Sequence, residues 1–251
     1  MLTKFMFLKK VIKLKKEHMI LFWQKKDCIM PCGVSRLVSE KREKSLSLLD
    51  NIKDFEVAIS ERLKDLPGSN SHIKLASVNR PVYEPMGNYR TGSVMLLVNN
   101  KNNLPHLVMI KRAEDGKVHS GQIAFPGGKA ESDESLTLTA LRELEEEIGI
   151  KNDSINIIGA LTRIYIPPSN YMVYPFIATQ INPSAFLANA SEVQTIFEIS
   201  LLSLIANKKI VKDVEHQTTR GLIKAPAFKI DNLVIWGATA MILSEFIDLI
   251  D

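Results

Sequence analysis

The stretch GKAESDESLTLTALRELEEEIGI, residues 128–150, carries the strongest structural signal in the chain. Its central part, residues 134–147, predicts a helix. Asp133 stands where an N-terminal cap belongs, and Glu134 would favour the positive end of the helix dipole. Gly149 stands where a left-handed residue commonly ends a helix. The stretch therefore predicts a helix with a defined beginning and end.

Three glutamates of this helix, Glu143, Glu146 and Glu147, are spaced i, i+3 and i+4. At this spacing they fall within a sector about 100° wide, where their charges repel unless a cation neutralises them. Carboxylate oxygens of this kind suit Mg²⁺ or Mn²⁺, which commonly bridge to substrate phosphates. Arg142 can pair with a carboxylate or hold a phosphate. Taken alone, the same run also fits a solvated acidic helix face.

The spacing of further residues resembles the signature of the Nudix hydrolase family, G-x5-E-x7-R-E-U-x-E-E-x-G-U, in which U is a bulky aliphatic residue. The chain matches every fixed position with the spacing intact. The matching residues are Gly128, Glu134, Arg142, Glu143, Leu144, Glu146, Glu147, Gly149 and Ile150. The resemblance implies a metal-dependent enzyme that cleaves a diphosphate linkage.

By this resemblance, Glu143 and Glu147 are the expected direct metal ligands, followed by Glu146, with the backbone carbonyl of Gly127 as a further ligand. The same three glutamates and Arg142 are the expected catalytic residues, with Arg142 orienting a glutamate. The metal would neutralise the diphosphate and position water, while one carboxylate accepts the proton of that water. Which glutamate acts as the base differs among family members and stays open.

Two further acids are weaker candidates. Glu134 is expected to support the site or to reach the metal through water. Glu192 lies in a distal loop segment and could contribute to the site, although a solvated loop acid is the alternative interpretation.

The residues before the signature resemble a pattern of coenzyme A diphosphatases, L-L-T-x-R-[SA]-x3-R-x3-G-x3-F-P-G-G. Arg112, Ala113, Gly121 and the run Phe125 to Gly128 match in register, while Lys117 replaces an arginine and so loses its bidentate geometry. Coenzyme A (CoA) carries a 3′-phosphate beside its diphosphate, so its site needs additional cations. The expected substrate-binding residues are Arg112, Lys117, Gly121 and Gly128. Tyr171 and Trp236 lie in two further segments that resemble the same subgroup more weakly, and both could equally be core or hairpin residues.

Three functions are therefore weighed. The first is hydrolysis of CoA or acyl-CoA to 3′,5′-ADP and (acyl-)4′-phosphopantetheine. The second is a Nudix hydrolase for ADP-ribose or another nucleoside diphosphate derivative. The third is a non-catalytic Nudix domain that acts as a binding module, which the retained glutamates disfavour.

The remaining elements mix strands with few helices, which predicts an α/β (α+β) fold, an α/β/α sandwich with a mixed sheet. The family resemblance implies that this sandwich is Nudix-like. Helices are expected over residues 45–66, 201–206 and 236–250. Strands are expected over residues 93–98, 107–110, 123–125, 155–166, 172–180, 193–200, 222–228 and 232–235. Residues 71–90 read as irregular.

The net charge of +4 is unevenly distributed. Residues 1–44 hold twelve Lys and Arg against four Asp and Glu, so we expect a basic, poorly ordered extension followed by a Nudix domain over residues 45–251. Cys28 and Cys32 make neither a disulfide framework nor a zinc site. No apolar run is long enough to span a membrane, and no basic stripe indicates nucleic-acid binding. A cytoplasmic enzyme with a small-molecule substrate is expected, and the sequence leaves a homodimer open.

Overall fold

The structure is a computed structural model that describes residues 49–77, 85, 87–114, 116, 119–218 and 221–251. The expected basic extension over residues 1–44, together with Cys28 and Cys32, lies outside these residues, as does Lys117. Among the described residues, no helix is long and apolar enough to cross a membrane.

The main sheet is mixed, as the sequence predicts. Its central strand β1 (Arg90–Lys101) pairs in parallel with β7 (Tyr171–Gln180) and antiparallel with β2 (Leu104–Arg112). β1 and β2 form a hairpin whose turn residues, Asn102 and Asn103, both have positive φ, as the favoured two-residue hairpin turns require. The other strands of this sheet are β3 (Ile123–Ala124), β4 (Gly127–Lys129), β5 (Asn156–Ala160), β6 (Ile164–Ile166) and β8 (Val193–Ser200).

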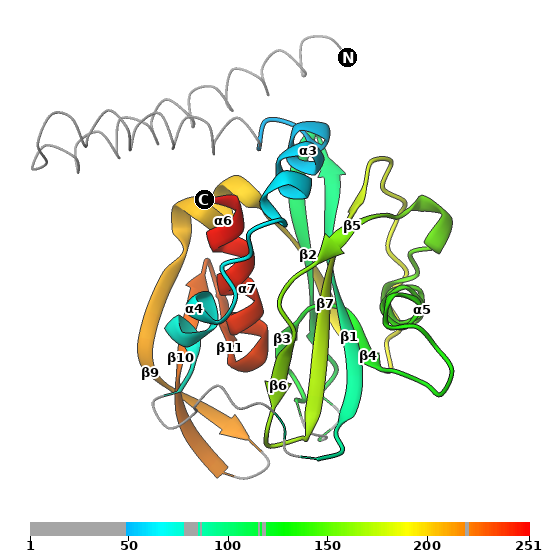
Figure 1. The fold of residues 1–251 in the computed structure, drawn as a ribbon. Coiled ribbons are helices and arrows are strands. Elements are labelled where there is room, and N and C mark those ends of the chain that lie inside the picture. The colour runs from blue at the N-terminus through cyan, green and yellow to red at the C-terminus, as the bar shows by residue number, and fades with distance from the viewer. Residues whose placement is uncertain (1–48, 78–84, 86, 115, 117–118, 219–220) are drawn as a thin grey trace, which may run out of the picture. The chain divides into compact units, whose positions relative to one another are not determined.

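Helices cover both faces of this sheet (Figure 1). Side chains alternate along β1, so Leu96 and Val98 join one hydrophobic cluster while Met95 and Leu97 join another. The first cluster contains helix α7 (Gly237–Ile250), and the second contains helix α5 (Leu136–Ile148). The expected α/β/α sandwich is therefore confirmed.

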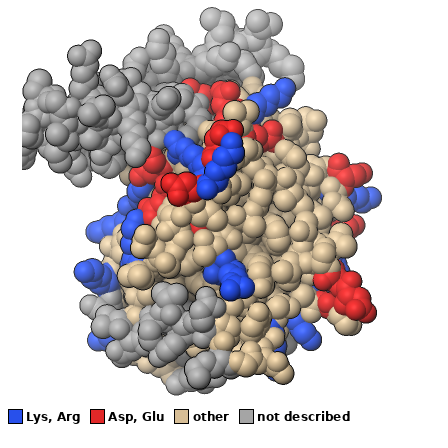
Figure 2. All heavy atoms as spheres, viewed as in Figure 1, with Lys and Arg blue, Asp and Glu red and all other residues tan. Residues whose placement is uncertain are grey.

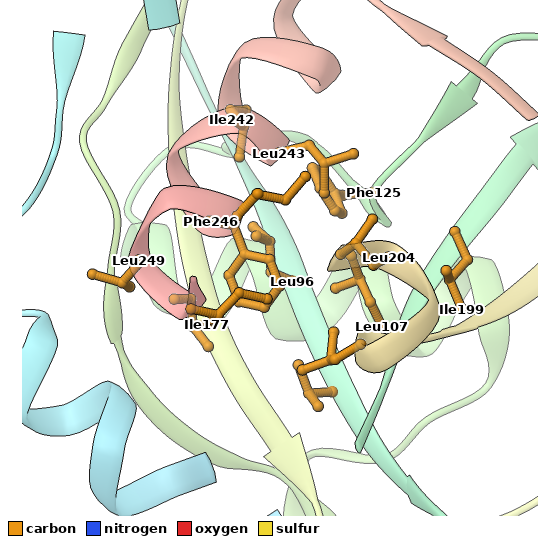
Figure 3. Packing of buried hydrophobic residues seen from close by; sticks show 14 of the residues in the cluster. Leu96, Leu107, Phe125, Ile177, Ile199, Leu204, Ile242, Leu243, Phe246 and Leu249 are labelled. Carbon is orange, nitrogen blue, oxygen red and sulfur yellow. The ribbon is translucent and has the colours of Figure 1, made fainter. Parts of the chain in front are cut away.

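The cluster around α7 is the larger of the two. Figure 3 shows Leu243 and Phe246 of α7 above Leu96 of the sheet, and all three side chains are buried. Helix α3 (Ile52–Arg62) adds Phe55, whose ring meets the ring of Phe246 edge-on at 6.3 Å. Helix α7 is therefore buried along most of its length.

A second sheet of three strands packs beside α7. It consists of β9 (Lys209–Thr218), β10 (Gly221–Ile230) and β11 (Leu233–Trp236), in the order β11-β10-β9. The sequence predicts the β10–β11 hairpin but gives no strand over β9. The short helix α6 (Leu201–Asn207) leads from β8 into this sheet.

Several expected boundaries were wrong. The helix expected over 45–66 begins at Ile52 within the described residues, because the side chain of Asn51 accepts the backbone N–H groups of Lys53 and Asp54. The strand expected over 155–166 is interrupted between β5 and β6. Residues 71–90, expected to be irregular, contribute to the short helix α4 (Ser69–His72) and to the 3₁₀ turn Ile73–Leu75.

Charged side chains do not gather into one basic area on the face in Figure 2. Among the described residues there, Lys and Arg are scattered and alternate with Asp and Glu around a broad uncharged surface.

Candidate active site

The glutamate helix α5 begins later than the sequence suggests. Ser135 is its N-cap, with a side-chain oxygen that accepts the backbone N–H of Leu138 at 3.2 Å. The expected cap, Asp133, was wrong, because Asp133 lies in a turn with φ 69° and precedes the helix by three residues. Glu134 is thereby left outside the helix, where its carboxylate turns back towards Arg142.

Glu147 is the most deeply buried acid of the site, with 1% of its side chain exposed. One carboxylate oxygen accepts the backbone N–H of Gly127 at 2.9 Å, and the other lies 3.2 Å from a guanidinium nitrogen of Arg112. Burial raises the pKa of Glu147 to about 7, and these two contacts only partly oppose that rise. A cation beside Glu147 would therefore relieve an unfavourable buried charge.

Glu143 lies one turn earlier on the same face and is 13% exposed. Its carboxylate lies against Gly128, where an added Cβ atom would come within 2.4 Å of a carboxylate oxygen. Burial raises the pKa of Glu143, and the negative charges of Glu146 and Glu192 add to the effect. A glycine at position 128 therefore leaves room for the carboxylate of Glu143, and no unusual backbone angle at Gly128 calls for a glycine.

Arg142 connects the acids of the site to one another. Its guanidinium contacts the carboxylates of Glu134 at 3.1 Å, Glu143 at 3.0 Å and Glu146 at 2.8 Å, and it donates to the backbone carbonyl of Lys129 at 3.1 Å. The hydrogen bond from Arg142 lowers the pKa of Glu134. The expected orienting contact between Arg142 and a glutamate is therefore present, and it extends to three glutamates.

The residues expected to bind substrate lie at different places. Arg112 lies at the end of β2, and its guanidinium contacts the carboxylate of Glu147. Its side chain therefore lies within the acid cluster. Gly121 follows in the loop with φ 68°, a left-handed conformation that favours glycine. Gly128 lies under Glu143 in β4.

The loop that follows β7 covers the end of α5. Backbone N–H groups of Leu187 and Asn189 donate to the carbonyls of Ile148 and Glu147 at 2.9 and 3.0 Å. The loop then brings Glu192 beside the site, where its backbone carbonyl accepts the N–H of Ala113 and its charge reaches Glu143 and Glu147. The exposed side chain of Glu192 makes no direct contact with either glutamate among the hydrogen bonds and ion pairs of the described residues.

Comparison with known proteins assigns this arrangement to a family. The family model described as NUDIX domain matches residues 88–214. The chain belongs to the Nudix family. A curated relative, the uncharacterized Nudix hydrolase NudL of Yersinia pestis (strain Pestoides F), is 34% identical over 141 residues, which cover 55% of this chain and 69% of the relative. The protein is accordingly a Nudix diphosphatase.

Solved structures give a weaker comparison. The MutT protein from Methanosarcina mazei Go1 is 19% identical with a TM-score of 0.43, covering 66% of this chain and 96% of that protein. A MutT/Nudix family protein from Enterococcus faecalis is 14% identical with a TM-score of 0.44, covering 70% of each chain. Similarity at this level carries no argument about the site.

The Nudix helix can be tested for its fit to a divalent cation. Among the described residues, no group of three Asp, Glu, His or Cys side chains is arranged to hold a metal ion, and the carboxylates of Glu147 and Glu143 contact Arg112 and Arg142. Mg²⁺, however, needs only one or two protein carboxylates and takes its remaining ligands from water and phosphate. Glu143 and Glu147 supply buried oxygen donors whose charge is destabilised by burial, so the donor set fits.

Proposed function

We propose that this Nudix hydrolase cleaves the diphosphate of CoA or acyl-CoA, giving 3′,5′-ADP and (acyl-)4′-phosphopantetheine. The observation that carries the proposal is the contact of Arg112 with Glu147. Arg112 is the arginine of the sequence pattern that resembles CoA diphosphatases, and its contact with the glutamate helix supports a role for that pattern in the reaction. We propose further that the Nudix domain covers residues 45–251, including helix α3.

Glu143 and Glu147 are proposed to hold Mg²⁺ or Mn²⁺, with Glu146 and the carbonyl of Gly127 as further ligands. Nudix hydrolases in general use such divalent cations. When bound, the metal would neutralise charge on the diphosphate and lower the pKa of water. The proposal is supported by the raised pKa values of Glu143 and Glu147, because their contacts with Arg142 and Arg112 only partly offset the cost of burying their charge.

The chain's own residues have separate tasks. Arg142 holds Glu134, Glu143 and Glu146 in one orientation, which keeps the carboxylates in place before substrate arrives. One of the site glutamates accepts the proton of the attacking water. The partly exposed guanidinium of Arg112, which contacts Glu147, would also be able to bind a phosphate oxygen of the substrate. Lys117, outside the described residues, is proposed as a second phosphate-binding cation.

The experiment compares substrates and matched variants. The protein is incubated with Mg²⁺ or Mn²⁺ and with CoA, ADP-ribose, NADH or a deoxynucleoside triphosphate, and the products are identified by mass spectrometry. Glu147→Gln should abolish turnover, whereas Glu145→Gln, on the exposed side of the same helix, should leave it unchanged. If ADP-ribose is cleaved and CoA stays intact, the proposal that CoA is the substrate is wrong. Unchanged turnover in Glu147→Gln would overturn the metal site.

A further inference from the structure

Ser93 is a buried polar residue in an apolar part of strand β1. Its side chain is 0% exposed, and its hydroxyl has no hydrogen-bond partner among the described residues. The residues that follow it in the strand, Val94 to Val98, are all apolar. A buried hydroxyl without a partner destabilises a fold, because it loses its hydrogen bonds to water and gains none in return. An alanine would fill the same position without this penalty.

Ser93 lies on the face of the sheet that helix α5 covers. Side chains alternate along a strand, so Ser93 points to the same face as Met95 and Leu97. Both of these residues belong to the hydrophobic cluster that contains α5. Since the glutamates of the candidate active site lie on α5, the hydroxyl of Ser93 is on their side of the sheet.

The residue opposite Ser93 on strand β4 is Gly128. Directly opposite residues of antiparallel strands point to the same face, with Cβ atoms about 5 Å apart. The carboxylate of Glu143 lies against Gly128, with its two oxygens 2.4 and 2.6 Å from the position of an added Cβ atom. The hydroxyl of Ser93 and the carboxylate of Glu143 are therefore neighbours across the space that Gly128 leaves open.

The carboxylate of Glu143 can accept a further hydrogen bond. It is 13% exposed, and among the hydrogen bonds of the described residues it accepts from Arg142 alone, through one oxygen at 3.0 Å. Arg142 also contacts Glu134 and Glu146, so Glu143 shares this donor with two other acids. Carboxylates that bind a metal ion are themselves held by hydrogen bonds, and Ser93 is the neighbouring residue with a hydroxyl to offer.

We infer that Ser93 is a positioning residue for Glu143, and that its hydroxyl donates a hydrogen bond to the carboxylate of Glu143 when this carboxylate holds the metal ion. The inference rests on the proposed metal site and does not depend on CoA as the substrate. The hydrogen bond limits the directions in which the carboxylate can turn, which favours metal binding. It also explains a serine at a position where a buried apolar residue would make the metal-free fold more stable.

The test measures metal affinity and stability in the same variants. Electron paramagnetic resonance follows the binding of Mn²⁺ to the full chain, and chemical denaturation in EDTA measures the stability of the metal-free protein. Ser93→Ala removes the hydroxyl and little else. It should weaken Mn²⁺ binding about tenfold, as for other residues that orient metal ligands. The metal-free variant should be as stable as the wild type or more stable, because an unpartnered hydroxyl is lost.

Two further variants separate positioning from packing. Ser93→Thr keeps the hydroxyl and should recover most of the affinity for Mn²⁺, even though the added methyl group lowers stability. Thr179→Val is the matched control, because Thr179 on β7 has an equally buried hydroxyl that donates to the carboxylate of Glu56. This control should show the reverse pattern, a loss of stability with unchanged affinity for Mn²⁺.

A double-mutant cycle connects Ser93 to Glu143. In the Glu143→Gln background, Ser93→Ala should cause no further loss of Mn²⁺ affinity. Unchanged affinity in Ser93→Ala, or an equal loss in both backgrounds, would overturn the inference. Lower stability of metal-free Ser93→Ala would also overturn it, because the hydroxyl would then have a partner in the folded protein before metal binds.

The inference and the proposed function can fail separately. If Mn²⁺ affinity depends on Ser93 but CoA is not cleaved, the proposed substrate is wrong and the role of Ser93 stands. If CoA is cleaved but Mn²⁺ affinity does not depend on Ser93, the inference is wrong and the proposed function stands. If the wild-type protein binds no Mn²⁺, the proposed metal site and the role of Ser93 are both wrong.

Discussion

The carboxylate of Glu143 occupies the space into which a side chain at Gly128 would project, with only 2.4 Å between a carboxylate oxygen and an added Cβ atom. The first residue of the Nudix signature therefore packs against a glutamate of the signature helix that lies fifteen positions later in the sequence. The backbone angles of Gly128 do not explain the glycine, since its φ is not positive.

Gly128→Ala should therefore displace Glu143 and impair catalysis more than folding. We expect kcat/KM to fall about a hundredfold, because a shift of about 1 Å at a catalytic group has effects of that size. The melting temperature should change little, since the displaced atoms are the end of a flexible side chain. Steady-state kinetics and thermal unfolding of the same preparation check both parts. Full activity in the variant would contradict the proposed role of Glu143.

The buried carboxyl of Glu147 should make the stability of the metal-free protein depend on pH. Its pKa is raised from 4.5 to about 7 in the folded state, so the folded protein holds a proton that the unfolded chain releases between these values. Stability from this group is therefore greatest below pH 4.5 and decreases as pH rises to about 7, by on the order of 3 kcal/mol.

Denaturant unfolding in EDTA across this range measures the effect. Other carboxylates titrate in the same window, so the wild-type protein is compared with Glu147→Gln, which lacks the titrating group. As pH rises, the free energy of unfolding of the wild type should fall relative to that of Glu147→Gln. Adding Mg²⁺ at pH 7.5 should restore stability to the wild type alone. A pH-independent difference would argue against a raised pKa.

Arg142 should act jointly with the acids that it holds. Arg142→Gln leaves Glu134, Glu143 and Glu146 without their shared cation, and we expect a loss of about 10- to 100-fold in activity, as for other residues that orient metal ligands. Arg142→Lys should recover little, because an ammonium group cannot contact all three. A double-mutant cycle with Glu134→Gln should be non-additive, and strictly additive losses would show that the two residues act independently.

A buried polar cluster centred on helix α7, a different helix from the one that carries the site glutamates, should control stability. The carboxylate of Glu245 is fully buried and accepts four kinds of hydrogen bond. Two come from side chains, a ring nitrogen of His72 at 2.9 Å and the hydroxyl of Thr162 at 2.6 Å. The others come from the backbone N–H groups of Gly68 and Thr162. Glu245→Gln breaks this set, and we expect a loss of about 3 kcal/mol.

The matched control is Lys74→Gln, which removes the half-exposed ion pair with Asp248 and should cost less than about 1 kcal/mol. Both variants should retain their activity at temperatures where they are folded. A small effect for Glu245→Gln in chemical denaturation would mean that the buried carboxylate is dispensable.

The sequence predicts the sandwich, the mixed sheet and the glutamate helix because hydrophobic spacing and the signature specify them directly. It misplaces the helix cap, since Asp133 and Ser135 are both good capping residues and only the turn at Asp133 decides between them. It misses β9, whose residues alternate little between apolar and polar. The contacts of Glu147 with the backbone of Gly127, and of Arg142 with the carbonyl of Lys129, join segments that only the fold brings together.

The residues expected to bind substrate show the same limit. The sequence pattern assigns Arg112 to substrate binding, whereas its position at the end of β2 brings its guanidinium to Glu147. Sequence patterns likewise do not reveal that Arg90 lies beside Tyr171, since this neighbourhood depends on the parallel pairing of β1 with β7. Parallel pairing joins strands distant in the chain, so local sequence patterns do not reveal it.

The most direct test of the proposed activity is the identification of products from CoA in the presence of Mg²⁺. Hydrolysis should yield 3′,5′-ADP and 4′-phosphopantetheine in equal amounts, at a kcat/KM above that for ADP-ribose, and Glu147→Gln should yield neither product. Intact CoA after prolonged incubation with a protein that cleaves ADP-ribose would contradict the proposal.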